Sequence, residues 1–121
     1  KVATFKYWKR GTKKIAKRYL SEIKNNKIQL PVCNNFNDHV FHLFVIRTEN
    51  RDKLQEYLYK NGIETVIHYP IPPHKQKALQ EFNHLSLPIT EKIHQEVLSL
   101  PMSSVLSDEE ITHIIATLNS Y

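Results

Sequence analysis

The chain has 121 residues, of which 40% are hydrophobic, and this suits one domain with a modest core. No apolar run approaches the roughly 18 residues of a transmembrane helix, no signal-peptide pattern is recognised, and the lone Cys33 excludes an internal disulfide. These features argue against a membrane protein and a disulfide scaffold, so we expect a cytoplasmic protein.

Positive charge is concentrated at the start of the chain. Residues 1–30 hold ten Lys and Arg against one acid, Glu22, and carry +9; since the whole chain carries +5, the remainder carries −4. Apolar residues in this segment recur at helical spacing, with a gap at Gly11-Thr12. They are Phe5, Trp8, Ile15, Ala16, Tyr19 and Ile23. We therefore divide the chain into a basic amphipathic entry helix, residues 1–27, and a small α+β domain, residues 28–121.

The basic face of this helix has three readings. It can be simply solvated, it can contact another domain or subunit, or it can hold the phosphates of a nucleic acid. No motif that reads DNA or RNA accompanies it.

The next segments predict short strands and a helix. Ile28 to Leu30 can form a strand, and the apolar run from Val40 to Ile46 is typical of a central strand, with His42 as a core or edge histidine. Asn50 can cap a helix, and Gly62 can end it in the left-handed conformation. The following strand, Thr65 to Ile67, would complete a β-α-β unit.

Two histidines and a tyrosine follow that last strand among three prolines. His68 and Tyr69 stand where the strand ends and the stiff segment with Pro70, Pro72 and Pro73 begins; His74 comes next. Because proline fixes φ and removes an N–H donor, the backbone at His68 and Tyr69 has little freedom. The two side chains therefore keep a fixed orientation, as the wall of a binding site requires. A buried histidine bonded to a nearby acceptor would show the same pattern.

The rest of the chain predicts helices around one more strand. We expect a short helical stretch from Lys75 to Phe82, a helix capped by Thr90 and running through Val97, and an edge strand from Leu98 to Leu100. Ser107 opens a capping box with Glu110. The helix after it carries one apolar stripe, which we assign to the core: Ile111, Ile114, Ile115 and Leu118. The fold class is α+β, with a small, mostly antiparallel sheet of three to four strands packed with helices.

The chain contains no recognisable complete active site. It has two glycines and no glycine-rich phosphate loop, nucleophile elbow or zinc-protease motif. His39 and His42 are not joined by a Cys or Asp set that would make a metal site. We therefore assign no catalytic residue and no metal ligand.

Four ordered stretches resemble one protein family. They read H-L-F-V-I-R-T-E-N-R-D-K-L-Q-E-Y-L, then N-G-I-E-T-V-I-H-Y-P-I-P-P-H-K-Q, then L-P-I-T-E-K-I-H-Q-E-V-L-S-L-P-M followed by S-D-E-E-I. Together they resemble the C-terminal small domain of the DegT/DnrJ/EryC1/StrS family of pyridoxal-phosphate-dependent sugar aminotransferases.

The resemblance implies a fold, a cofactor and partners. It implies the small domain of a type I aminotransferase that works as a homodimer and moves an amino group, usually from glutamate, to a nucleotide-linked keto-sugar. Such enzymes make amino-deoxy sugars for surface polysaccharides, for example O-antigen, or for antibiotics. We expect no nucleic acid or membrane among the partners. The family's catalytic lysine and most cofactor contacts belong to an N-terminal domain, so we expect a fragment that is inactive alone. His68 and Tyr69 match the family's substrate-facing pair, and His74 matches the histidine after it.

One reading of another class stays open beside this one. The chain could be a stand-alone module, either regulatory or using its basic helix to contact nucleic acid or a protein partner.

Overall fold

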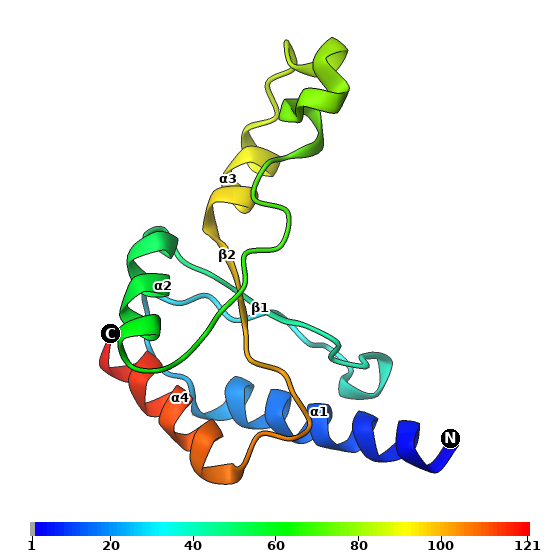
Figure 1. Cartoon of the computed structure of the whole chain (residues 1–121), viewed down its shortest axis with the longest axis vertical. Helices are drawn as coiled ribbons and strands as arrows, with labels where there is room; N and C mark the ends of the chain where they lie inside the picture. Colours follow the sequence, from blue (N-terminus) through cyan, green and yellow to red (C-terminus); the bar gives the residue numbers. More distant parts are fainter. Residues whose placement is uncertain (1) are drawn as a thin grey trace.

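The computed structural model describes the backbone of residues 2–121 and the side chains from Gly11 onward. Figure 1 shows two regions. In the body, three helices surround a small sheet; the arm, residues 67–96, projects away from it. Phe5 and Trp8, expected on the apolar face of the first helix, lie outside the described side chains. No described helix is both long and apolar enough to cross a lipid bilayer.

Helix α1 (Val2–Glu22) is continuous through Gly11-Thr12, so the expected gap in its pattern is not a break in the helix. A Cβ on Gly11 would lie 3.0 Å from Cβ of Ser104, which means that the gap is where the C-terminal loop crosses close to the helix. Thr12 is buried there, and its hydroxyl donates to the carbonyl of Val40 at 3.3 Å. The described part of the predicted apolar face is confirmed, since Ile15, Ala16, Tyr19 and Ile23 are all buried.

The sheet is small and antiparallel, which confirms the predicted fold class. Strands β1 (Phe44–Arg47) and β2 (Val97–Leu100) pair with Phe44 opposite Leu100. A single antiparallel bridge lies on each outer side, from Gln29 to Arg47 and from Val66 to Ser99. The four segments therefore stand in the order Gln29, β1, β2, Val66.

Three strand predictions need correction. The run from Val40 to Ile46 becomes a strand only at Phe44, because Phe41 has a left-handed backbone (φ +49°) that interrupts an extended chain. His42 consequently precedes the strand and is exposed rather than in the core. β2 is not an edge strand, since it lies between β1 and Val66.

The predicted β-α-β unit is also split by β2. Val66 bridges to β2 and not to β1. The expected strand from Thr65 to Ile67 is reduced to that one bridge, and the Val66 side chain is exposed. Two antiparallel neighbours of one strand run parallel to each other, so β1 and Val66 keep the direction of a β-α-β unit with a strand inserted between them.

The remaining helices follow the sequence signals with one shift. Helix α2 (Arg51–Lys60) begins after Asn50, and Gly62 beyond it has φ +77°, as predicted. Helix α4 (Asp108–Ser120) begins with the predicted capping box, and its apolar stripe is buried. Helix α3 (Pro88–Glu96) begins before Thr90, because proline is favoured at the first helical position, and ends before Val97. Short 3₁₀ helices span Phe36–Asp38, Pro73–Lys75 and Lys77–Phe82.

Helices α1 and α4 form the base of the body. Asp108, in the first turn of α4, pairs with Lys14 of α1 at 2.9 Å, and Arg18 donates to the Asp108 carbonyl at 3.1 Å. Deeper in the core, the Tyr19 hydroxyl donates to the Pro101 carbonyl at 2.9 Å, and burial raises the pKa of Tyr19. The basic face of α1 is thus partly neutralised by α4.

Candidate functional site

The candidate site begins where the chain leaves the sheet for the arm. Val66 is held by both backbone hydrogen bonds of its bridge to Ser99. The Val66 nitrogen lies 3.2 Å from the Ser99 carbonyl oxygen, and the Ser99 nitrogen lies 2.9 Å from the Val66 carbonyl oxygen. Three residues later Tyr69 has a left-handed backbone with φ +54°, which is uncommon for a residue other than glycine. The segment therefore turns sharply within three residues of the sheet.

His68 points back to the sheet at this turn. Its ring is partly buried, and Nδ1 lies 2.8 Å from the hydroxyl oxygen of Ser99 in β2. Within the part of the chain that the structure describes, no hydrogen bond or ion pair involves Nε2 of His68. One nitrogen of the ring is thus fixed by the body, and the other is available to a ligand.

Tyr69 points outward beside it. The residue is 75% exposed, and its carbonyl is bonded by Nδ1 of His94 from helix α3. This contact joins the unusual backbone of Tyr69 to helix α3 of the arm. The main chain from which the exposed phenol projects is therefore held in place. The structure therefore brings His68 and Tyr69 together at one turn.

His74 occupies a different environment in the arm. It is only 6% exposed, and its Nε2 lies 2.9 Å from a carboxylate oxygen of Glu91. The hydrogen bond from His74, followed by one from the backbone N–H of Leu87, holds the pKa of Glu91 below its ordinary value. The contacts of His74 fasten the 3₁₀ turn to α3; its part in a binding site stays a prediction.

Two residues of this site escaped the sequence reasoning. Ser99 and His94 contact the His68-Tyr69 pair from positions 31 and 25 residues away along the chain. A serine within an apolar strand is a weak signal of a buried polar partner, but nothing in the sequence says which one. A helical histidine such as His94 gives no signal at all.

The chemistry that this turn offers is hydrogen bonding by neutral groups. An imidazole nitrogen and a phenol can bond hydroxyl, carbonyl or phosphate oxygens. None of the lysines with a described side chain is buried. Since a lysine needs burial or a neighbouring cation to act as a neutral amine, these lysines do not fit the anchor of a pyridoxal group. The described residues also contain no cluster of three or more His, Cys, Asp or Glu that could hold a metal.

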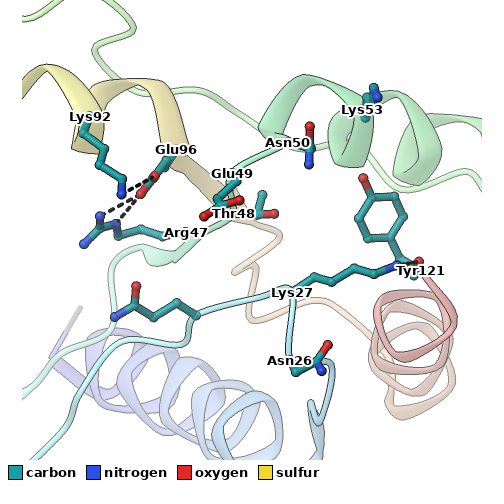
Figure 2. A pocket seen from close by; sticks show the side chains of 11 residues that line it. Asn26, Lys27, Arg47, Thr48, Glu49, Asn50, Lys53, Lys92, Glu96 and Tyr121 are labelled. Atoms are coloured by element: carbon teal, nitrogen blue, oxygen red, sulfur yellow. Dashed lines mark hydrogen bonds and ion pairs between the residues drawn. The ribbon is translucent and has the colours of Figure 1, made fainter.

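A separate pocket of about 580 Å³ lies between β1, the start of α2, the end of α3 and the C-terminal Tyr121 (Figure 2). Three of its charged side chains bind one another. The buried Glu96 accepts from Arg47 at 2.7 and 3.1 Å, with Lys92 3.7 Å away. Lys27 donates to the Tyr121 carbonyl at 2.8 Å. Neither His68 nor Tyr69 lines this pocket, so it is distinct from the turn.

The model of the DegT/DnrJ/EryC1/StrS aminotransferase family matches residues 1–119. One relative is a dTDP-3-amino-3,6-dideoxy-alpha-D-galactopyranose transaminase of Aneurinibacillus thermoaerophilus, 50% identical over 109 residues. A second is the erythromycin biosynthesis sensory transduction protein EryC1 of Saccharopolyspora erythraea, 40% identical over 116 residues. The alignments cover 90% and 93% of this chain but 30% and 32% of the relatives, so the chain spans about a third of their length.

Solved structures agree with the sequence relatives. S. venezuelae DesV in complex with a ketimine intermediate matches with a TM-score of 0.90 at 34% identity, over 98% of this chain and 33% of that one. The Bacillus subtilis protein ntda with bound cofactor PMP matches with a TM-score of 0.80 at 31% identity, over 91% and 27%.

Proposed function

Since this chain belongs to the DegT/DnrJ/EryC1/StrS aminotransferase family, we propose that it is the C-terminal domain of a sugar-nucleotide aminotransferase. The whole enzyme would use pyridoxal phosphate to move an amino group from glutamate to a nucleotide-linked keto-deoxy-sugar. Transaminases of dTDP-sugars among the relatives support this substrate class. The product would enter a surface polysaccharide such as an O-antigen.

The observation that carries the proposal is the turn at His68 and Tyr69. The partly buried imidazole is held by the Ser99 hydroxyl, and the exposed phenol belongs to a residue whose carbonyl is bonded by His94. Both groups suit the hydroxyl and phosphate oxygens of a sugar nucleotide without the cost of burying a charge. His74 would support the site from the arm through its bond to Glu91. Residues 1–27, which contain helix α1, would serve as the segment that enters the domain formed by residues 28–121.

In this proposal the pyridoxal group is held mainly by another domain. The lysines with described side chains, all exposed or half-buried, support that division, and we expect the chain alone to be inactive. The whole enzyme would act as a cytoplasmic homodimer. The alternative of a nucleic-acid module loses support because Lys14 and Arg18 of the basic face are engaged with Asp108 of α4.

A chimera tests the proposal directly. The aligned C-terminal third of the Aneurinibacillus transaminase is replaced by this chain, and transamination of the dTDP-keto-sugar is measured. We expect an active chimera that binds pyridoxal phosphate. His68→Ala and Tyr69→Ala should each lower kcat/KM by about 10- to 100-fold, the effect of losing one or two substrate hydrogen bonds.

The matched control is His84→Ala, an exposed histidine of the arm outside the turn. It should leave activity unchanged, and all variants should keep the absorbance of the bound cofactor. Full activity in both site variants would remove His68 and Tyr69 from the site. Salt-dependent retention of DNA or RNA by the 121-residue chain, with an inactive chimera that folds, would favour the nucleic-acid reading.

A further inference from the structure

Ser99 makes three bonds to the segment that carries His68. Its backbone N–H and carbonyl form the bridge to Val66, and its hydroxyl lies 2.8 Å from Nδ1 of His68. Ser99 is only 5% exposed and belongs to the inner strand β2. One residue of the sheet thus fixes both the backbone before the turn and the imidazole within it.

The direction of the proton in the bond between Ser99 and His68 follows from the surroundings. If Nδ1 of His68 carried the proton, it would donate to Ser99, and the Ser99 hydroxyl would need another acceptor. In the described part of the molecule, His68 is the one hydrogen-bond partner of the Ser99 hydroxyl. A buried hydroxyl hydrogen without an acceptor costs roughly 1–3 kcal/mol. The favoured arrangement therefore has Ser99 donating to an unprotonated Nδ1.

We propose that Ser99 is a positioning residue that holds neutral His68 with its proton on Nε2. The nitrogen that faces away from the sheet is then a hydrogen-bond donor. It suits an acceptor oxygen, such as a carbonyl, a hydroxyl or a diphosphate oxygen of the sugar nucleotide, and in this state it does not accept a proton. This use of the donor rests on the proposed function, whereas the position of the proton does not.

Other histidines of the chain provide internal references. Nδ1 of His94 contacts the Tyr69 carbonyl, which only accepts, so neutral His94 carries its proton on Nδ1. Nε2 of His113 lies 2.9 Å from the Asn61 carbonyl, so neutral His113 carries its proton on Nε2. His68 should therefore resemble His113 and differ from His94.

Long-range ¹H–¹⁵N spectra of the 121-residue chain labelled at histidine test this assignment. They are recorded near pH 8, where an imidazole of ordinary pKa, about 6.5, is neutral. Single replacements by Gln assign the signals. We expect a pyridine-type shift for Nδ1 and a pyrrole-type shift for Nε2 of His68, as for His113. A pyrrole-type Nδ1 in His68 would overturn the proposal, and this wild-type measurement needs no variant to fold.

Substitutions of Ser99 then test the cause. Ser99→Ala should give a mixture of both His68 tautomers, and Ser99→Thr, which keeps the hydroxyl, should restore the single form. Thr117→Val is the control, because it removes a buried hydroxyl of α4 that donates to the His113 carbonyl, away from the turn. An unchanged tautomer in Ser99→Ala would remove Ser99 from this role. If Ser99→Ala mixes the His68 tautomers but the chimera with this substitution keeps full activity, the result would count against the proposed function. The positioning role of Ser99 would still stand.

Discussion

The body and the arm of this chain are stabilised by different means. The body buries a continuous set of apolar side chains from α1, α2, α4 and both strands. The arm leaves six large apolar residues exposed: Tyr69, Ile71, Phe82, Leu85, Leu87 and Ile89. Its shape depends on prolines and on polar contacts, such as the bond from His74 to Glu91 and those from Lys75 to the carbonyls of Asn83 and Leu85. Burial therefore determines the stability of the body, whereas directional bonds determine the geometry of the arm (Figure 1).

The largest expected effect comes from a cavity in the body. Leu98 is fully buried in β2, so Leu98→Ala removes packed methyl groups and should lower the free energy of unfolding by about 2–5 kcal/mol. Chemical denaturation of the chain measures it. Ile89→Ala in the arm is the matched control: that side chain is 78% exposed, and the change should stay within about 0.5 kcal/mol. Equal losses in the two variants would abolish the distinction between body and arm.

A middle-sized effect is expected from the buried histidine of the arm. His74→Ala removes the group that bonds Glu91 and leaves a void in the turn, so the arm should open more often than the body. Amide exchange between Pro73 and Glu91 should become roughly tenfold faster, with exchange in α1 and α4 unchanged. His84→Ala, which alters an exposed histidine of the same arm, should have no such effect. Exchange that rises throughout the chain would mean that arm and body open as one unit.

The smallest expected effect is a response of the arm to acid. The pKa of Glu91 is lowered in the folded arm, chiefly by the bond from His74, so the opened arm binds the proton more readily than the folded arm. The stabilisation is therefore complete above the ordinary glutamate value, about 4.3, and is lost as the pH falls through the lowered pKa. Carboxyl chemical shifts should place the titration of Glu91 below that ordinary value. In His74→Ala the midpoint should rise toward it, and an unmoved midpoint would contradict this account.

Helices could be predicted from the sequence because each carries its own local signals. The stripe of α4 extends over about two turns, and the capping box fixes where the helix begins. The strands carry little local information, since each has four residues and two further segments pair through one residue only. The left-handed Phe41 shows the limit plainly, because an apolar run that favours a strand is overruled by one backbone conformation.

The candidate site was only partly accessible to sequence reasoning for the same reason. The prolines after Tyr69 indicate a rigid exit, and the family resemblance singles out His68 and Tyr69. The orientation of both residues is set by Ser99 and His94, which the fold brings from β2 and α3. Such contacts depend on tertiary structure, and no spacing rule in one sequence encodes them.

The order of the sheet segments also dictates when the domain can assemble during synthesis. Strand β2 is made after both segments that flank it, β1 and Val66. A nascent chain that has left the ribosome only as far as the arm therefore holds β1 and the segment at Val66 with an unfilled gap between them, and the arm itself is the long loop that must close. Until Val97 to Leu100 emerge, those edges stay open to wrong pairing, a state in which chaperones protect growing polypeptides.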